Sequence, residues 1–291
     1  MDVIKAVFLG IIQGITEFLP ISSSGHISLF THFFKIENET GGLFSAMLHI
    51  GTLVAILITF YKPIYELFIE FFAVIKDIST KNFKFNLKEM SETRIMLLLF
   101  IISCAPLLIL LLPVGNGNNL MDLVGVFSSD SSIKAEGLCF MFTGFFLLLG
   151  SITSENTIRT KKILPFSALM IGIAQFFAAC FPGISRSGST ISTALCCRIS
   201  KKNAVRYSFI LSVPAVIASG LVEFKDAFES TEVVPVIPLL LGIITSAVVG
   251  MFTIKLLQII IRRNLFKYFG FYCLGLGFVV TIIGAIEVFV K

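Results

Sequence analysis

The sequence has few charged residues for its length. Only 14% of its 291 residues are Asp, Glu, Lys or Arg, whereas a soluble domain has roughly 25%. Hydrophobic residues make up 56% of the chain, and apolar runs such as 95–112 and 236–254 recur along it. About 20 apolar residues suffice for one helical crossing of a bilayer, and backbone in lipid must satisfy its own hydrogen bonds. The composition excludes a soluble globular domain, gives no indication of nucleic-acid binding, and predicts an all-α polytopic membrane protein.

Two other features are missing. The first 20 residues contain no small-residue cleavage site, so we expect no cleaved signal peptide. The six cysteines lie in apolar segments and show no CxxC spacing, so we expect reduced packing residues rather than disulfides or metal ligands.

The charges that are present predict the orientation. Lys and Arg are concentrated in segments that alternate along the chain with acidic ones, and the positive-inside rule places the basic segments in the cytoplasm. The cytoplasmic segments are then 76–94, 155–162 and 198–206, and the outer ones are 36–43, 114–136 and 223–235. Six crossings follow: 44–61, 95–112, 137–153, 204–222, 236–258 and 266–290. The stretch 63–76 is expected to form an interfacial helix.

Two segments do not fit as crossings. Residues 1–35 must begin and end outside, and residues 163–203 must begin and end inside. Each contains a central proline beside serines and a glycine, in "FLPISSSGH" and "FPGISRSGST". Irregular backbone at membrane depth is tolerated only where it is buried in protein or lines a wet cavity. Each segment is therefore predicted to be a re-entrant helical hairpin.

The two hairpins also resemble each other in sequence. "GIIQGITEFLPISSSGH" aligns with "GIAQFFAACFPGISRSGS" after one inserted residue, Gly183. Their opposite orientations predict an inverted-topology repeat within one membrane domain, 1–291, with repeat one at 1–154 and repeat two at 163–291. The matched positions are Gly10 with Gly172, Gln13 with Gln175, Pro20 with Pro182, and 22–25 with 185–188.

Three side chains in the hairpins stand out from their apolar surroundings. Glu17 is an ionisable residue at membrane depth, which costs at least ~2.5 kcal/mol and is a functional hypothesis by default. His26 ends the serine run of the same hairpin. Arg186 lies between serines at a predicted helix start, where its fork of donors suits phosphate oxygens. Small residues alone would be explained by helix packing, but the arginine would not.

A pocket between the two hairpin tips would suit phosphoryl transfer. Arg186 and free backbone amides would hold the charge, a hydroxyl or water would attack, and Glu17 or His26 would move protons. The substrate expected in lipid is a lipid phosphate or diphosphate. The predicted pocket contains Glu17, Ser22, Ser23, Ser24, His26, Ser185, Arg186, Ser187 and Thr190.

The pair "QGITEFLPISSSGH" and "FPGISRSGST" resembles the signature of the bacterial undecaprenyl-diphosphatase family, the bacitracin-resistance phosphatases. The resemblance implies hydrolysis of undecaprenyl diphosphate for peptidoglycan synthesis, a divalent cation (Mg²⁺ or Ca²⁺), and a plasma-membrane site that opens toward the outer face. By motif position it implies catalytic roles for Glu17, His26, Ser23 and Arg186, with Glu17 also a metal ligand, alone or with Gln13. The diphosphate contacts it implies are Ser22, Ser24, Gly25, Ser185, Ser187, Gly188 and Thr190.

Several alternatives stay open. Many members of that family have Glu where this chain has Gln13, which puts a two-carboxylate metal site in doubt. Either Ser23 or a Glu17-activated water would be the nucleophile. A lipid carrier (flippase) has the same architecture of broken helices, and would need the arginine but not the acid–base groups. The sequence contains no Arg-Pro pair, which excludes lipid phosphatases of the Lys…Arg-Pro type, and it gives no basis for assigning an oligomer.

Overall fold

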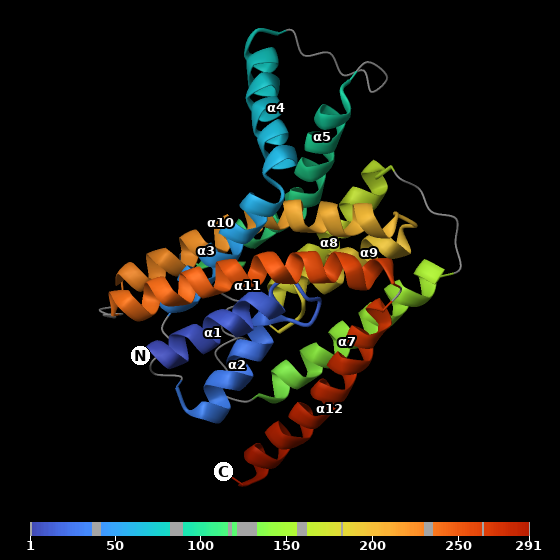
Figure 1. Cartoon of the computed structure of the whole chain (residues 1–291). Helices are drawn as coiled ribbons and strands as arrows, with labels where there is room; N and C mark the ends of the chain where they lie inside the picture. The colour runs from blue at the N-terminus through green and yellow to red at the C-terminus, as the bar shows by residue number, and fades with distance from the viewer. Residues whose placement is uncertain are drawn as a thin grey trace.

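A computed structural model of the chain describes residues 2–36, 42–81, 90–115, 118–120, 133–155, 162–181, 183–229, 235–263 and 265–290. In this part the chain is helical apart from one short antiparallel pair of strands, which confirms the all-α prediction. Figure 1 shows most helices packed side by side in one body, from which α4 and the first part of α5 project. Parts of the predicted loops 36–43, 76–94, 114–136, 155–162 and 223–235 lie outside the described residues.

The elements follow one another with short connections. In chain order they are α1 (Val3–Thr16), α2 (Ser23–Phe34), α3 (Gly42–Thr59), α4 (Tyr61–Ser79), α5 (Glu92–Cys104), the 3₁₀ helix η2 (Ala105–Leu111), β1 (Pro113–Gly115), β2 (Asn118–Asn119), α7 (Lys134–Glu155), α8 (Pro165–Cys180), α9 (Arg186–Cys196), α10 (Lys201–Glu229), α11 (Val236–Arg262) and α12 (Phe266–Val290).

Four helical segments among the described residues are long and apolar enough to cross a membrane, and a fifth is obtained if the bent pair α3–α4 is one span. This supports a multi-pass membrane protein. The predicted crossing 44–61 corresponds to α3, whereas 204–222 lies within α10, which is not among these segments. Six crossings therefore remain a prediction. The four segments are Glu92–Leu111, Lys134–Ser154, Val236–Arg262 and Phe266–Phe289.

Helix α4 leaves α3 at a right angle. The two helices are bent by 90° at Phe60, and α4 includes the whole of the predicted interfacial stretch 63–76. Arg94 of α5 holds α4 through Glu70 at 2.5 Å and Asp77 at 2.9 Å. Large apolar side chains of α4 remain exposed, so the helix has the mixed surface of one that lies along an interface.

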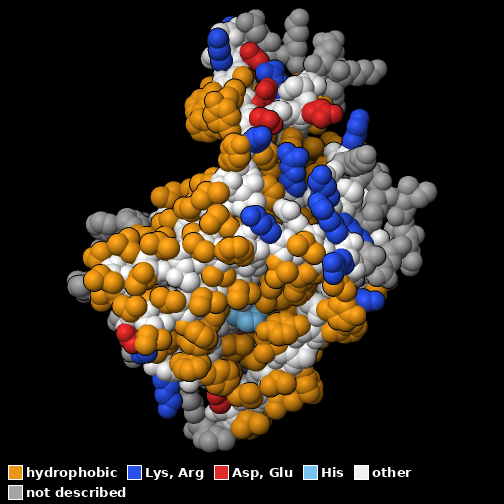
Figure 2. Space-filling model, in the orientation of Figure 1, with side chains coloured by type: hydrophobic (Ala, Val, Ile, Leu, Met, Phe, Trp, Pro, Cys, Tyr) orange, Lys and Arg blue, Asp and Glu red, His pale blue; other side chains and the backbone are white. Residues whose placement is uncertain are grey.

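The surface of the helical body is mostly apolar. Figure 2 shows hydrophobic side chains over most of the visible face, while Lys and Arg gather near the base of the projecting α4 and α5. A surface of this kind is suited to lipid contact rather than to water.

Each predicted hairpin is a pair of short helices with a break between them. The helices have 14 and 12 residues in α1 and α2, and 16 and 11 in α8 and α9. None reaches the ~20 residues of a full crossing, as a re-entrant hairpin requires. The break in the first pair contains Pro20, and Pro182 of the second lies outside the described residues. The inverted arrangement of the two repeats stays a prediction.

Close helix contacts are made where glycine leaves room. Helices α7 and α12 pack along much of their length, and Gly277 of α12 lies against the Gly137 carbonyl and the Met141 amide of α7. A Cβ at Gly277 would stand 2.6 Å from that carbonyl oxygen, whereas a Cβ at Gly275 would meet nothing within 4 Å. Small residues allow this approach in membrane helices.

We expect Gly277→Ala to destabilise the protein and Gly275→Ala to leave it unchanged or more stable. The first change forces α7 and α12 apart, at ~1–3 kcal/mol, while the second gains up to ~1 kcal/mol of helix propensity with no clash. Thermal unfolding in one detergent measures both. Equal melting temperatures for the two variants would contradict the close α7–α12 contact.

Candidate functional site

Helices α2 and α9 are capped in the same way. The Ser22 hydroxyl accepts a hydrogen bond from the Gly25 amide at 3.2 Å, and the Ser185 hydroxyl accepts one from the Gly188 amide at 3.0 Å. Caps of this kind stabilise a helix by ~1 kcal/mol each. The two serine–glycine motifs of the sequence thus form two helix starts with equivalent hydrogen bonding.

The two helix starts lie beside each other. Ser24 Oγ accepts a hydrogen bond from the Gly183 amide at 3.2 Å, and the Ser187 hydroxyl donates to the Leu19 carbonyl at 3.5 Å. Gly183 has a φ of +105°, which glycine adopts without strain. First-turn amides have no partner within their helix and form the positive end of its dipole. Two such ends together favour an anion.

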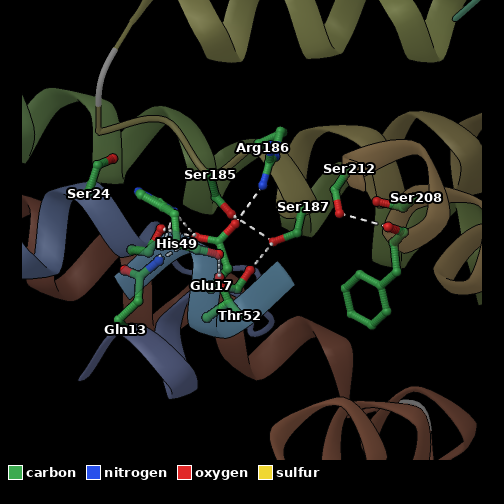
Figure 3. Close-up of polar contacts among 12 residues, drawn as sticks. Gln13, Glu17, Ser24, His49, Thr52, Ser185, Arg186, Ser187, Ser208 and Ser212 are labelled. Carbon is green, nitrogen blue, oxygen red and sulfur yellow. Dashed lines mark hydrogen bonds and ion pairs between the residues drawn. The ribbon is translucent and has the colours of Figure 1, made fainter. Parts of the chain in front are cut away.

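A buried ion pair joins the first helix pair to the second. Arg186 Nη2 donates to Glu17 Oε1 at 2.5 Å, and Figure 3 shows the arginine pointing toward the carboxylate beside Ser185 and Ser187. The Glu17 side chain is 6% exposed and that of Arg186 is 24% exposed, so the guanidinium alone keeps substantial access to open space. Among the described residues, Arg186 makes only this one side-chain hydrogen bond, which leaves N–H donors for a ligand.

The second oxygen of Glu17 has its own partners. Ser23 Oγ donates to Glu17 Oε2 at 2.7 Å, and Gln13 Nε2 donates to the same oxygen at 3.2 Å. Gln13 Nε2 also lies 2.9 Å from Nδ1 of His49, which is itself 3.7 Å from Glu17 Oε2. Because an amide nitrogen can only donate, His49 Nδ1 is the acceptor and its proton is on Nε2. Because the Ser23 hydroxyl is hydrogen bonded directly to Oε2, Glu17 is placed to accept the Ser23 proton.

These groups line a cavity of about 430 Å³ that has two kinds of surface. Its polar part contains Glu17, Arg186, His49 and the serines at both helix starts. The other part is apolar and comes from η2, α8, α10 and the connection between α8 and α9. Such a cavity suits an amphiphile with an anionic head and an apolar chain. The apolar lining includes Leu107, Leu108, Leu110, Leu111, Ala178, Ala179, Ile184, Pro214, Ala215 and Ala218.

Most of the predicted site residues line this cavity. Gly25 and Gly188 serve instead in the two caps, and a Cβ at Gly25 would stand 2.7 Å from the Phe140 ring. Gln13 contacts Glu17 and His49 but does not line the cavity, and neither do His26 and Thr190. The predicted residues that line it are Glu17, Ser22, Ser23, Ser24, Ser185, Arg186 and Ser187.

His26 is held away from the cavity by two hydrogen bonds. Its Nδ1 lies 2.7 Å from the Ser22 carbonyl, and its Nε2 lies 2.8 Å from the Tyr272 hydroxyl. Because a carbonyl can only accept, Nδ1 carries the proton and Nε2 of the neutral ring accepts from tyrosine. The expectation that His26 shares the cavity with Glu17 is not met. In this structure His26 holds the turn that precedes Ser23.

Thr190 lies behind the ion pair. Its hydroxyl is hydrogen bonded to the Arg186 carbonyl at 2.9 Å and to Ser208 at 2.5 Å. With Ser208 and Ser212 it lines a second cavity of about 10 Å³ on that side, which is close to the smallest volume that holds one water. Figure 3 shows these two serines on the side of Ser187 away from His49. Thr190 is thus placed to support Arg186 rather than to touch a ligand in the main cavity.

His49 is a residue of the site that was not predicted from the sequence. It lies on α3, 19% of its side chain is exposed, and it contacts both Gln13 and Glu17. An ionisable residue inside a predicted crossing is itself a functional signal, and His49 lies within the stretch 44–61. Hydropathy alone could not show that this histidine faces the hairpin tips.

The described residues offer a divalent cation only a partial site. No group of three or more His, Cys, Asp or Glu side chains among them could hold a metal ion. Within the described part of the chain, Glu17 is the one carboxylate that lines the cavity, and both of its oxygens already accept hydrogen bonds. Gln13 Oε1 is a buried oxygen with no partner among the described residues. Since Mg²⁺ takes one or two carboxylates together with substrate phosphates, these residues fit a cation carried by a phosphorylated ligand better than a protein cage.

Fold and site together define a multi-pass helical membrane protein whose cavity, between two broken helix pairs, has a polar side with Arg186 and an apolar side. The chain belongs to the bacitracin resistance protein BacA family, which it matches over residues 6–279. It is 37% identical to an undecaprenyl-diphosphatase of Methanosphaera stadtmanae, over 98% of this chain and 99% of that one. It is 35% identical to one of Halothermothrix orenii (98% and 100%) and 32% identical to undecaprenyl-diphosphatase 3 of Bacillus cereus (99% and 100%).

We expect Arg186→Lys to weaken the binding of inorganic diphosphate by about tenfold or more. Lysine keeps the charge but lacks the planar fork that binds two oxygens at once, and a hydrogen bond to a charged group contributes ~1.5–3 kcal/mol. Titration calorimetry on the purified protein measures the affinity. The control is Arg263→Lys, at an exposed position at the end of α11. Equal affinities for Arg186→Lys and the control would exclude bidentate binding by Arg186.

Proposed function

We propose that this protein is an undecaprenyl-diphosphatase, which hydrolyses undecaprenyl diphosphate to undecaprenyl phosphate and inorganic phosphate. The observation that carries the proposal is the arrangement around Glu17, with Arg186 on one carboxylate oxygen and the Ser23 hydroxyl on the other. The full-length relatives that bear this name support it. The reaction returns the lipid carrier to peptidoglycan synthesis, and a larger supply of the monophosphate would explain the resistance in the family's name.

The cavity provides for both parts of the substrate. The diphosphate would lie at the two helix starts, where Arg186 and the first-turn amides supply donors. Its prenyl chain would follow the apolar side formed by η2 and α10 toward lipid. Ser22, Ser24, Ser185 and Ser187 line the polar side and would add hydroxyl contacts.

The attacking group in this proposal is Ser23. Its Oγ forms a bond to the terminal phosphorus while its proton passes to Glu17 Oε2, 2.7 Å away. The bond between that phosphorus and the bridging oxygen breaks, and the electron pair leaves with undecaprenyl phosphate. Glu17 returns to the carboxylate when it passes its proton to the departing phosphate. Water then attacks the phosphoserine with Glu17 as the base, the bond between phosphorus and Ser23 Oγ breaks, and Oγ takes the proton back from Glu17, which releases inorganic phosphate and restores Ser23. A water activated by Glu17 in a single step is the alternative.

A divalent cation, Mg²⁺ or Ca²⁺, is part of the proposal as a companion of the diphosphate. Glu17 is the protein group that would touch it, whereas Gln13 Oε1 is buried beside Glu17 and does not line the cavity. When bound it would neutralise charge on the phosphate oxygens. The protein's own contribution remains the positioning of Ser23, Glu17 and Arg186.

A lipid carrier is the second candidate function, because broken helices around a central site are a transporter architecture. A carrier would need the anion clamp of Arg186 but has no use for a hydroxyl hydrogen bonded to a carboxylate. We also propose that the site opens toward the outer face of the plasma membrane, as membership of the family implies.

Purified protein is expected to release phosphate from undecaprenyl diphosphate, and EDTA is expected to slow this release. The assay uses one detergent preparation, with Mg²⁺ and Ca²⁺ added back separately. A protein that binds the lipid diphosphate, releases no phosphate with either cation and moves the lipid between the leaflets of a vesicle would be a carrier instead.

We expect Ser23→Ala to reduce turnover by about 100-fold or more while binding of undecaprenyl diphosphate survives. The change removes the attacking atom but leaves Arg186 and the helix starts in place. Loss of one hydrogen bond alone, at ~0.5–1.5 kcal/mol, would lower the rate by about tenfold or less. The control is Ser79→Ala, where the hydroxyl only donates to a carbonyl of its own helix. A loss of tenfold or less would favour attack by water.

The same assay distinguishes a catalytic role for Glu17 from a structural role for His26. Glu17→Gln is expected to lower turnover by about 100-fold or more, since it removes the proton acceptor of Ser23. If His26 only holds the Ser22 turn, Tyr272→Phe and His26→Ala should cost turnover far less. A loss for His26→Ala as large as that for Glu17→Gln would instead give His26 a catalytic role.

A further inference from the structure

Gln175 is a buried amide without a protein partner. It lies on α8, is 1% exposed, and lines the main cavity. Neither its Nε2 nor its Oε1 has a hydrogen-bond partner among the described residues. Leaving a buried donor or acceptor unpaired costs ~1–3 kcal/mol, so a fold that leaves both unpaired needs a reason for doing so. A ligand in the cavity would supply the missing partners.

The first helix pair shows what such an amide binds. Gln13 is the residue aligned with Gln175, and its Nε2 donates to the Glu17 carboxylate one helical turn later, at 3.2 Å. In the second motif the residue aligned with Glu17 is Ala179, which also lines the cavity. The second pair therefore has the amide and a small side chain where the first has the amide and a carboxylate. Gln175 Nε2 therefore lacks the carboxylate oxygen that Gln13 Nε2 has in the first helix pair.

Helix packing holds Gln175 in position. One turn earlier, Gly172 lies so close to α5 that a Cβ there would stand 2.4 Å from the Ser103 carbonyl oxygen. The Ser103 hydroxyl also donates to the Ala168 carbonyl of α8 at 2.7 Å. With α8 packed closely against α5, the backbone of α8 holds Gln175 beside Ala178 and Ala179 in the lining of the cavity.

We propose that Gln175 binds the diphosphate of the substrate, with Nε2 donating to a phosphate oxygen where the carboxylate of Glu17 stands in the first helix pair. This rests on the proposed function and adds a residue to it. An ionised phosphate has no proton for the acceptor Oε1, so a water held by the same diphosphate donates to it. Gln175 is then a headgroup-binding residue that favours a diphosphate over an uncharged amphiphile.

The test is Gln175→Met, which keeps the length of the side chain and removes both polar atoms. The protein without ligand is expected to melt at the same temperature or higher, because two unpaired buried groups are gone. The KM for undecaprenyl diphosphate is expected to rise by about 10- to 100-fold, as for a lost hydrogen bond to a charged group. The shift in melting temperature caused by inorganic diphosphate should shrink in parallel.

The matched control is Gln258→Met, the same change at a half-buried position of α11 away from the main cavity. Its KM should equal that of the unchanged protein. A second variant, Gln175→Glu, keeps the shape but replaces the donor with a negative charge, and should weaken diphosphate binding more than Gln175→Met.

Two results would overturn the inference. One is a Gln175→Met protein that fails to fold or melts at a lower temperature, because the amide would then have a structural partner. The other is an unchanged KM together with an unchanged shift by inorganic diphosphate. Failure of the proposed function would be seen separately, as unchanged protein that releases no phosphate from undecaprenyl diphosphate.

Discussion

Glu17 and Arg186 come from helix pairs far apart in the chain, and their ion pair holds these pairs in contact within a largely apolar protein. Replacing either partner by a neutral residue would leave the other charge unpaired in the interior, which lowers the free energy of unfolding by ~3–5 kcal/mol. Its position also fixes which groups face the cavity. One carboxylate oxygen is taken by arginine, so the other is left for Ser23, and the remaining guanidinium donors are left for a ligand.

The polar groups around the cavity divide by whether the protein satisfies them. Both oxygens of Glu17 have protein partners, and so do both ring nitrogens of His26. Gln175 has none among the described residues. Satisfied groups are rigid parts of the site, whereas an unsatisfied buried group marks a place that a ligand completes. Under the proposal, polar groups with protein partners hold the shape of the site, and Gln175 gains its hydrogen-bond partner when the substrate binds.

Helices and helix starts could be predicted from the sequence, whereas the directions in which side chains point could not. Apolar runs predicted the long apolar helices that include 95–112, 137–153, 236–258 and 266–290, and the serine–glycine motifs lie at two helix starts, because both features depend on residues close together in the chain. Which way a side chain points depends on packing between distant helices. His26 was expected beside Glu17 but lies against Tyr272 of α12, while His49 of α3 lies there instead. Pro63, in the first turn of α4, is typical of a helix start near Phe60, but it does not give the 90° angle between α3 and α4.

The ion pair also bears on how the protein is made. Glu17 and Arg186 are 169 residues apart, so the carboxylate is synthesised and meets the membrane well before its partner exists. A lone carboxylate at membrane depth is costly. The carboxylate of the first helix pair therefore lacks its cationic partner until α9 is made, and the arrival of Arg186 completes the charge balance. The N-terminal helices thus depend, for the partner of their one buried carboxylate, on a helix made much later in the chain.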